Sequence, residues 1–344
     1  MLQKYLRLTG LGLVSLVITL SLSFYFGVNA QPPKTITFVS YAVTQSAYSK
    51  IIPQFTADWK KKTGQNVEFR QSYAGSGSQT KAIINGLEAD VAALALAGDT
   101  KKLEKAGLIE PGWEDRAPND AIVTKSVVAF VTRDKGVKPT KWSDLADEKV
   151  KVITANPKTS GGAQWNFLGL WGSVALNGGT EAQAKAFVKK VYDNIPVAEL
   201  PKDAREASDV FYKRGRGNVL LNYENEAILA KKKGSKVPYY VPTDYNISID
   251  NPIAVVDKNV DKHGTRAIAE AFVKYTFTPQ AQQEFAKVGF RSVNPQVAKE
   301  FTSEYPEVKK LVTVKDFGGW GNIQTRFFAD KAIFDQIASG TFGR

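Results

Sequence analysis

A turn whose residues could bind an oxyanion spans residues 156–165, Asn-Pro-Lys-Thr-Ser-Gly-Gly-Ala-Gln-Trp. Ser160 offers a hydroxyl, and Gly161 and Gly162 offer backbone N–H groups that no side chain shields from a ligand. A helical pattern follows at once, and the first N–H groups of a helix lack partners and carry the positive end of the helix dipole. Neutral donors could therefore hold a dianion here. The alternative is an ordinary turn that caps a helix.

Two further turns have the same character. Residues 73–79, Tyr-Ala-Gly-Ser-Gly-Ser-Gln, are small and hydroxylic and lead into a predicted helix, and residues 201–205, Pro-Lys-Asp-Ala-Arg, open another. Three helix starts suit one small multivalent anion. A nucleotide is less well suited, because the chain contains neither Gly-x-x-x-x-Gly-Lys-Ser/Thr nor Gly-x-Gly-x-x-Gly.

The elements that must position these turns alternate between strand and helix. The patterns predict strands over 35–40 and 65–70, and a nearly continuous apolar run over 89–96 is typical of a buried parallel strand. Helices are predicted between them, over 46–62 and 78–86. The apolar residues of the first helix fall on one face: Tyr48, Ile51, Ile52, Phe55 and Trp59. The result is a β-α-β-α-β unit.

A second alternation begins after a loop near residues 111–119. Long strands over 121–133 and 247–256 are predicted to cross between two lobes, so that the chain passes between them twice. Between these crossings the sequence predicts a short helix from 142, strands over 150–154, 195–199, 217–221 and 237–241, and helices over 162–176, 181–192, 204–214 and 224–232. Helices over 264–276 and 279–288 then belong to the first lobe again.

This order predicts an α/β fold of two lobes joined by hinge strands, with the ligand in the cleft between them. Lobe I takes residues 31–120 and 250–310, and lobe II takes residues 121–249. Residues 311–344 form a C-terminal segment with a helix over about 324–337, whose lobe stays open. Ligands of such sheets bind at strand C-terminal ends and helix N-termini, where all three turns lie.

The first thirty residues predict export. Lys4 and Arg7 precede an apolar run over 11–26, and Val28-Asn29-Ala30 fits the small-residue rule for signal-peptidase cleavage. An uncleaved membrane anchor is the alternative, because the run is near the lower length limit for a span. The turn-forming residues after it favour cleavage. We therefore expect residues 1–30 to be a signal peptide and the mature chain to be exported.

The composition excludes several kinds of site. The chain has no cysteine, so it forms no disulfide and offers neither a cysteine nucleophile nor a cysteine metal site. Its single histidine, His263, lies in a polar helix entry and is predicted to be a solvated surface residue. No Gly-x-Ser-x-Gly elbow accompanies it. We expect no cofactor, no metal and no catalytic residue.

The 46 Lys and Arg against 34 Asp and Glu leave a formal net charge of +12. The cations are scattered, with short clusters at residues 60–62 and 231–233 at predicted helix ends, and no basic stripe is interleaved with aromatic residues. The charge predicts weak attraction of small anions and a solvated surface rather than a nucleic-acid partner. We expect a monomer.

Five segments, in order along the chain, together resemble the periplasmic sulfate-binding proteins of ABC importers. They are residues 69–77 (Phe-Arg-Gln-Ser-Tyr-Ala-Gly-Ser-Gly), 85–91 (Asn-Gly-Leu-Glu-Ala-Asp-Val), 156–165, 223–227 (Tyr-Glu-Asn-Glu-Ala) and 317–320 (Phe-Gly-Gly-Trp). The similarity extends over nearly the whole mature chain, and thiosulfate-binding proteins share these motifs. It implies a type II periplasmic binding fold whose lobes close over a dehydrated sulfate. It also implies membrane permease subunits as partners, driven by a cytoplasmic ATPase.

The resemblance further implies which groups bind sulfate. In that family, neutral donors from both lobes hold the anion. The matching donors are the backbone N–H groups of Ala42, Ser76, Gly161, Gly162 and Ala204, the Ser160 hydroxyl and the Tyr223 phenol.

Two positions depart from the family pattern. Ala42 stands in Ser40-Tyr41-Ala42 where the family usually has an aspartate, and a backbone N–H survives that change. Tyr223 aligns with a tryptophan whose indole N–H is a donor in the family. A phenol can donate too, but its oxygen reaches a different point and can also accept. Tyr223 therefore has two possible roles. Either its phenol replaces the indole as a donor, or Tyr223 only packs beside the cleft and a neighbouring residue or water is the donor.

Sulfate and phosphate make different demands on such a site. Sulfate at neutral pH is fully ionised and offers only acceptors, so a cage of donors satisfies it. Phosphate normally carries a proton that needs an acceptor, and such a mismatch supports discrimination of ~10⁴-fold. Because the Tyr223 oxygen could accept that proton, selectivity against phosphate is a prediction for titration to test.

Three other functions stay open. One is a binding protein for another oxyanion, such as molybdate or phosphate. Tyr239 and Tyr240 could hold ferric iron as paired tyrosinates, although Val-Pro-Tyr-Tyr-Val predicts a strand with one ring in the core. Glu224 and Glu226 could serve a secreted hydrolase, such as a sulfate-ester hydrolase. Their spacing places them on different helix faces, and a solvated helix start is the simpler interpretation.

Overall fold

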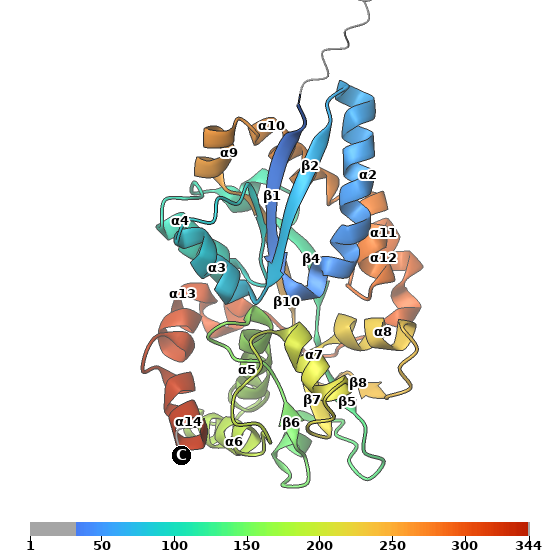
Figure 1. The fold of residues 1–344 in the computed structure, drawn as a ribbon. Helices are drawn as coiled ribbons and strands as arrows, with labels where there is room; N and C mark the ends of the chain where they lie inside the picture. Colours follow the sequence, from blue (N-terminus) through green and yellow to red (C-terminus); the bar gives the residue numbers. More distant parts are fainter. Residues whose placement is uncertain (1–31, 343–344) are drawn as a thin grey trace, which may run out of the picture.

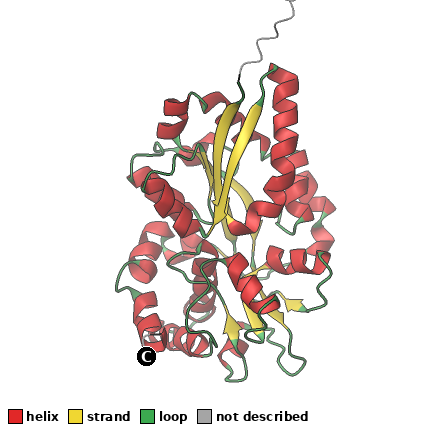
Figure 2. Cartoon of the chain, in the orientation of Figure 1, coloured by secondary structure: helices red, strands yellow, loops and turns green. Residues whose placement is uncertain are grey.

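The computed structural model describes residues 32–342, so the predicted signal peptide at residues 1–30 lies outside the described residues. Two lobes lie one above the other, each with a β-sheet covered by helices (Figures 1 and 2). We call the part built on the five-stranded sheet lobe I and the part built on the four-stranded sheet lobe II. The two-lobed α/β architecture predicted from the sequence is confirmed. Among residues 32–342, no helix combines the length and apolar character of a membrane span.

The sheet of lobe I has the strand order β2-β1-β3-β10-β4. β1 is parallel to β2 and β3, whereas β10 runs antiparallel to β3 and β4. The strands are β1 (Lys34–Tyr41), β2 (Val67–Ala74), β3 (Val91–Ala93), β4 (Ile122–Ser126) and β10 (Ile249–Val255). The predicted β-α-β-α-β unit is therefore present, and its parallel strands end at the edge that faces lobe II (Figure 1).

Helices cover both faces of this sheet. They are α2 (Gln45–Thr63), α3 (Ser76–Ile84), α4 (Ala97–Lys105), α9 (Asp257–His263), α10 (Arg266–Tyr275), α11 (Pro279–Lys287) and α12 (Pro295–Glu300). In α2, the predicted apolar face is buried at Tyr48, Ile51, Ile52 and Phe55. Gly64 ends this helix with φ of 74°, a left-handed conformation that glycine adopts without strain.

The chain crosses between the lobes twice. β4 leads through Val127 into β5 (Val128–Thr132), which belongs to the sheet of lobe II. The return passes from β9 (Asn246–Ile247) through Ser248 into β10. Both crossings were predicted, and the structure shows that each long predicted strand is two strands that serve different sheets. The lobe limits given above from the sequence stay predictions.

The sheet of lobe II has the order β6-β7-β5-β8, with β5 antiparallel to both of its neighbours. Its strands besides β5 are β6 (Val152–Ile153), β7 (Val219–Tyr223) and β8 (Tyr239–Tyr240). Its helices are η3 (Trp142–Ala146), α5 (Gly161–Ala175), α6 (Glu181–Asp193), α7 (Ala204–Tyr212) and α8 (Glu224–Lys232). β7 continues to Tyr223, two residues beyond its predicted end, and this brings Tyr223 to the edge that faces lobe I.

The C-terminal segment contacts both lobes. It comprises β11 (Leu311–Val312), η5 (Val314–Phe317), α13 (Gly319–Ile323), the π-helical turn η6 (Gln324–Phe328) and α14 (Ile333–Phe342). α14 packs beside α6 of lobe II. Trp320 of α13 lies against Gly98 of α4 in lobe I, where an added β-carbon would come within 2.9 Å of the indole.

Several sequence predictions were wrong in detail. Residues 195–199 form no strand, because this stretch is a loop after α6. The single helix predicted over about 324–337 is interrupted between η6 and α14, where Lys331 adopts a φ of 64°. α4, α9 and α12 were not predicted, since each is short and carries few apolar residues on which periodicity could be detected.

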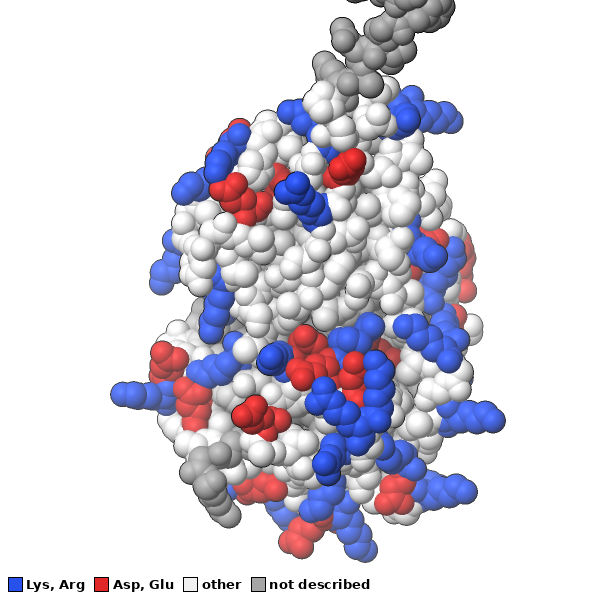
Figure 3. Space-filling view, viewed as in Figure 1, with Lys and Arg blue, Asp and Glu red and all other residues white. Residues whose placement is uncertain are grey.

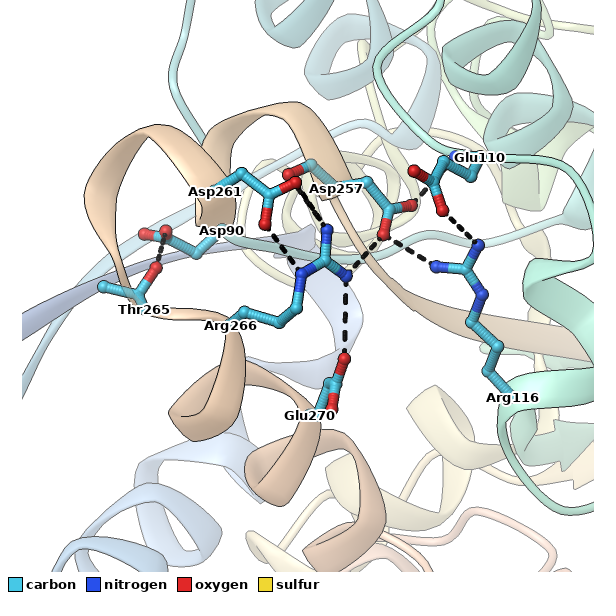
Figure 4. A network of polar contacts seen from close by, with 8 residues as sticks. All are labelled: Asp90, Glu110, Arg116, Asp257, Asp261, Thr265, Arg266 and Glu270. Carbon is cyan, nitrogen blue, oxygen red and sulfur yellow. Dashed lines mark hydrogen bonds and ion pairs between the residues drawn. The ribbon is translucent and has the colours of Figure 1, made fainter.

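A polar network ties together the end of lobe I that lies farthest from lobe II. Asp257 accepts hydrogen bonds from Arg116 at 2.7 Å and from Arg266 at 2.8 Å (Figure 4). These bonds join α9, α10 and the loop before β4. Burial favours a higher pKa for Asp257, but hydrogen bonds from the Glu110 amide, Arg266 and Arg116 together lower it below its ordinary value.

His263 was predicted to be a solvated surface residue, and this is confirmed only in part, because the side chain is partly exposed but both of its ring nitrogens face carboxylates. Its Nδ1 lies 2.9 Å from Asp90 and its Nε2 lies 2.9 Å from Glu88. Asp90 is fully buried and also accepts a hydrogen bond from the Thr265 hydroxyl. Hydrogen bonds that His263 donates to Glu88 and Asp90 raise the pKa of His263, because both carboxylates favour its charged form.

The basic residues lie on both lobes. On the face drawn in Figure 3, Lys and Arg gather more densely on lobe II than on lobe I, with Asp and Glu among them. Lys60, Lys61 and Lys62 occupy the last turn of α2, and Lys231 and Lys232 occupy that of α8, where cations complement the helix dipole.

Candidate functional site

A small cavity lies between the lobes where the three predicted turns meet. It is lined by Tyr41, Ala42, Val43, Ala74, Gly75, Ser76, Ala95, Ser160, Gly161, Gly162, Asp203, Ala204 and Tyr223. The structure thus brings together all seven residues named from the sequence. The space open to the centre of a water molecule is about 10 Å³. Pockets for drug-sized ligands occupy roughly 300–1,000 Å³, so this cavity suits only a small ligand.

The first turn supplies donors from lobe II at the start of α5. Ser160 is the N-cap, and its Oγ accepts a hydrogen bond from the Ala163 amide at 3.3 Å. The hydroxyl hydrogen of Ser160 is still available, because a serine hydroxyl can accept and donate at the same time. Gly161 and Gly162 are the first two helical residues, so their amides have no carbonyl within the helix to bind.

The second turn supplies one donor from lobe I, at the start of α3. The Ser76 hydroxyl is committed elsewhere: it donates to Asp99 at 2.7 Å and accepts from the Ala95 amide at 3.0 Å. The amides of Gly77 and Ser78 both donate to the carbonyl oxygen of Thr159 in lobe II. The Ser76 amide is therefore the donor of this turn that stays free to face the cavity.

The third turn begins α7 in lobe II. Asp203 caps this helix, and its Oδ1 accepts from the amides of Arg205 and Glu206, each at 2.9 Å. These bonds leave the Ala204 amide as the unpaired donor of the turn. Ala42 provides a comparable group in lobe I, since it opens a short 3₁₀ helix directly after β1.

Five amides thus converge from two lobes. None of the N–H groups of Ala42, Ser76, Gly161, Gly162 and Ala204 donates to a carbonyl outside its own helix among residues 32–342. Buried backbone donors are almost always paired, by protein or by something bound. An acceptor-rich ligand in the cavity would pair them.

Tyr223 adds a side-chain donor at the end of β7. Its side chain is 1% exposed, and its hydroxyl has no hydrogen-bond partner among the described residues. Burial raises the pKa of the Tyr223 phenol well above its ordinary value, with smaller contributions from Tyr41 and Glu226. The phenol therefore keeps its proton and can donate it. Because Tyr223 lines the cavity with its hydroxyl unpaired, the geometry favours the donor over a residue that only packs.

The glycines of the first turn are required by close packing. A β-carbon on Gly162 would stand 2.5 Å from the ring of Tyr223. One on Gly161 would stand 2.7 Å from the β-carbon of Ala95 in lobe I. Real β-carbons do not approach other atoms so closely. Gly162 is therefore needed within lobe II, and Gly161 is needed while the lobes are in contact.

Other contacts join the lobes around the cavity. The Trp165 indole N–H of lobe II donates to the Ala95 carbonyl of lobe I at 2.9 Å. Arg205 donates to the Val43 carbonyl across the boundary at 3.3 Å. The two lobes therefore meet on several sides of the cavity, which shields it from bulk water.

The carboxylates of Glu224 and Glu226 are not solvated, so that prediction was wrong. Glu224 is fully buried and receives two hydrogen bonds from Arg291 of lobe I, at 2.7 and 2.9 Å. Glu226 is 5% exposed and pairs with Arg205. Burial raises the pKa of Glu224 in spite of Arg291. Each carboxylate has its own arginine, so the two do not form the facing pair that hydrolysis would need.

The tyrosine pair offers little to a metal. Tyr239 and Tyr240 are both half-buried, and the Tyr239 ring packs against a core cluster of lobe II, so the prediction that one ring contacts the core is confirmed. They are neighbours in β8, and consecutive strand residues point to opposite faces. Among residues 32–342, no three His, Cys, Asp or Glu side chains are grouped as metal ligands.

Comparison with known proteins agrees with this architecture. Residues 36–291 match the family model described as "Bacterial extracellular solute-binding protein". A sulfate-binding protein of Synechocystis sp. is 61% identical over 313 residues, which cover 90% of this chain and 88% of the relative. This chain belongs to the bacterial extracellular solute-binding protein family.

Two further relatives of this solute-binding protein bear on its fold. The solved structure of the sulfate-binding protein SubI from Mycobacterium tuberculosis has a TM-score of 0.77 and 34% identity, and the match covers 86% of this chain and 99% of SubI. A thiosulfate-binding protein of Pseudomonas aeruginosa is 36% identical, over 88% of this chain and 91% of the relative. The periplasmic-binding-protein fold implied by the sequence is thereby confirmed.

Sequence reasoning missed several residues that line or support the cavity. Asp203 and Gly75 lay inside the quoted turns but received no role, although Asp three residues before Glu206 is a recognisable helix start. Asp99 had no local signal, because it meets Ser76 only through the packing of α3 against α4.

Proposed function

We propose that this solute-binding protein captures sulfate. The observation that carries the proposal is the set of neutral donors that converges on one small cavity. Five backbone amides, the Ser160 hydroxyl and the Tyr223 phenol all line it, and no Lys, Arg or His does so among the described residues. A fully ionised tetrahedral anion offers only acceptors and matches such a cage. Three α-helix N-termini add favourable dipoles.

The names of the relatives support the same ligand. They are called sulfate-binding proteins at 61% identity and thiosulfate-binding proteins at 36% identity. Thiosulfate has the same charge and shape as sulfate, with one sulfur in place of an oxygen, and is the second candidate ligand. The relatives are named as binding proteins, and we infer that this chain likewise binds its anion without chemical turnover.

Sulfate capture couples to closure in this proposal. Ala42 and Ser76 donate from lobe I, whereas Ser160, Gly161, Gly162, Ala204 and Tyr223 donate from lobe II. An anion bound to one lobe gains the other lobe's donors only when the lobes meet. Sulfate therefore shifts the equilibrium toward the closed state, to the extent that its affinity for the closed state exceeds its affinity for the open state.

The proposed setting follows from the same assignment. The chain is exported through a signal peptide at residues 1–30 and acts in the periplasm as a monomer. Its closed form delivers sulfate to permease subunits of an ABC importer driven by a cytoplasmic ATPase.

Titration calorimetry of the mature chain tests the proposal. We expect stoichiometric sulfate binding, a measurable response to thiosulfate, and much weaker heats with phosphate and molybdate near neutral pH. Phosphate binding as tight as that of sulfate would defeat the donor-only site, and ferric citrate binding without sulfate binding would support the iron alternative. Release of sulfate from an aryl sulfate ester would identify an enzyme instead.

Small-angle scattering tests closure separately. The radius of gyration should fall when saturating sulfate is added to the sulfate-free protein. An unchanged radius would count against hinge closure while leaving binding itself intact.

A further inference from the structure

Lys158 lies in the sulfate-binding turn but does not face the cavity. Its ammonium points into the C-terminal segment, where it donates to the Phe328 carbonyl at 3.0 Å, the Ala329 carbonyl at 3.2 Å and the Asp335 carboxylate at 2.9 Å. An ammonium has three hydrogens, so these three bonds use all of its donors. The side chain is only 28% exposed.

The acceptors of Lys158 are groups that need a donor. Phe328 ends the π-helical turn η6, and the last carbonyls of a helix have no partner within it. Asp335 lies in the first turn of α14 and also accepts from the Lys331 amide at 2.7 Å. Lys158 therefore joins the end of one helical turn to the start of the next. This makes the contact more specific than an ordinary surface ion pair, which contributes little.

The same C-terminal segment holds the other end of the turn. Gln324 donates to the Gln164 side-chain carbonyl at 2.8 Å, and the Gln164 amide group donates to the Pro157 carbonyl at 3.0 Å. The residues between these two attachments are Thr159 to Ala163, which include Ser160, Gly161 and Gly162. The C-terminal segment thus makes hydrogen bonds to the turn on both sides of its proposed sulfate donors.

We propose that Lys158 is a positioning residue that fixes the Gly161 and Gly162 amides for the anion by anchoring the turn to Asp335 and the carbonyls of Phe328 and Ala329. This inference rests on the proposed function for its ligand, but the anchoring itself does not depend on which anion binds. Binding groups must be held to within about half an ångström to act together, so an anchor two residues from Ser160 has a direct effect on them.

Lys158→Met tests the proposal, because methionine keeps most of the side-chain length but cannot donate. We expect sulfate affinity to fall about tenfold, the lower end of the loss measured when residues that orient metal ligands are removed. The amide resonances of Gly161 and Gly162 should shift, with or without sulfate. Lys158→Arg keeps the charge and donors, and it should restore affinity to within about threefold of the parent chain.

Lys185→Met is the matched control. Lys185 also reaches the C-terminal helix, with its ammonium 2.6 Å from the Gln336 side chain, but it lies on α6 and does not touch the turn. Its removal should leave affinity and both glycine resonances unchanged. Asp335→Ala removes the acidic partner of Lys158. The double variant Lys158→Met/Asp335→Ala should bind sulfate no more than about twofold more weakly than Lys158→Met, because both substitutions remove the same contact.

Three results would overturn the proposal. One is unchanged affinity and resonances in Lys158→Met, another is an equal loss in Lys185→Met, and the third is a Lys158→Arg variant as weak as Lys158→Met. If the parent chain binds no sulfate, the proposed function fails. The glycine resonances of the free protein still report whether Lys158 positions the turn. Thermal unfolding without sulfate shows whether each variant is folded.

Discussion

The carbonyl oxygen of Thr159 in lobe II accepts a hydrogen bond from the Gly77 amide of lobe I, with 3.0 Å between nitrogen and oxygen. The N-cap of α3 is Gly75, which has no side chain to satisfy the first amides of its helix. Lobe II therefore supplies the cap that α3 lacks. This cap exists only while the lobes are in contact, so it contributes to closure and not to the folding of lobe I alone.

Gly75→Ala should block closure. A β-carbon there would collide with the Thr159 carbonyl oxygen and stand 3.0 Å from that of Lys202. The φ of −59° and ψ of 137° at Gly75 suit alanine, so lobe I itself should fold normally. Overpacking of this kind costs about 1–3 kcal/mol, which corresponds to roughly 5- to 150-fold weaker sulfate binding by calorimetry.

The control for this variant is Gly321→Ala, where an added β-carbon meets nothing within 4 Å. It should bind sulfate like the parent chain. A Gly75→Ala protein that keeps parental affinity and the same sulfate-dependent compaction in scattering would show that the contact with Thr159 plays no part in closure.

Tyr223→Phe should weaken sulfate binding without weakening the fold. A hydrogen bond to a charged group contributes about 1.5–3 kcal/mol, so calorimetry should show roughly 10- to 100-fold lower affinity. Without sulfate, the free energy of unfolding should be equal or slightly higher, because a buried unpaired hydroxyl is removed. Tyr192→Phe is the control, since its hydroxyl is also buried and unpaired but does not line the cavity. Equal sulfate affinity in both variants would mean that Tyr223 only packs beside the cleft.

The free energy that His263 contributes to folding should depend on pH. Its pKa is raised in the folded state by Glu88 and Asp90, so the contribution is complete below the ordinary pKa of 6.5. It is lost as pH rises through the higher pKa of the folded protein. Urea unfolding of the parent chain and of His263→Gln should therefore differ most near pH 6 and converge in alkaline solution. A difference that grows with pH would contradict the assignment of a charged histidine.

Arg291→Met should destabilise the protein strongly. It leaves the fully buried Glu224 without its partner across the lobe boundary, and breaking a buried pair in this way costs about 3 kcal/mol or more. Urea unfolding measures the loss. Because burial already raises the pKa of Glu224, protonation relieves the unpaired charge, and the loss should be smaller at pH 5 than at pH 8.

The matched variant pairs Arg291→Met with Glu224→Gln, which removes the charge together with its partner. It should recover part of the lost stability. If the single and double variants are equally unstable at pH 8, the cost arises from the packing of Arg291 and not from the orphaned carboxylate.

Local chemistry made the helix starts readable in the sequence. Ser160 before two glycines, and Asp203 before Ala204, are helix N-terminal signals that require no knowledge of the rest of the chain. The β-α-β-α-β unit was readable for the same reason, since strand and helix periodicities are local. The signal failed where elements were short, as in α4, or where an apolar run had no neighbouring strand to pair with, as at residues 195–199.

The sequence alone determined the donors of this protein, because a backbone amide at a helix start and a hydroxyl beside it are set by neighbours a few residues away. Only the tertiary structure decided how they are used. It placed Gly161 against Ala95, committed the Ser76 hydroxyl to Asp99, and capped α3 with the Thr159 carbonyl from the other lobe. These partners are 23 to 82 residues apart in the chain. Contacts over such separations depend on how two folded lobes meet, which no local pattern encodes.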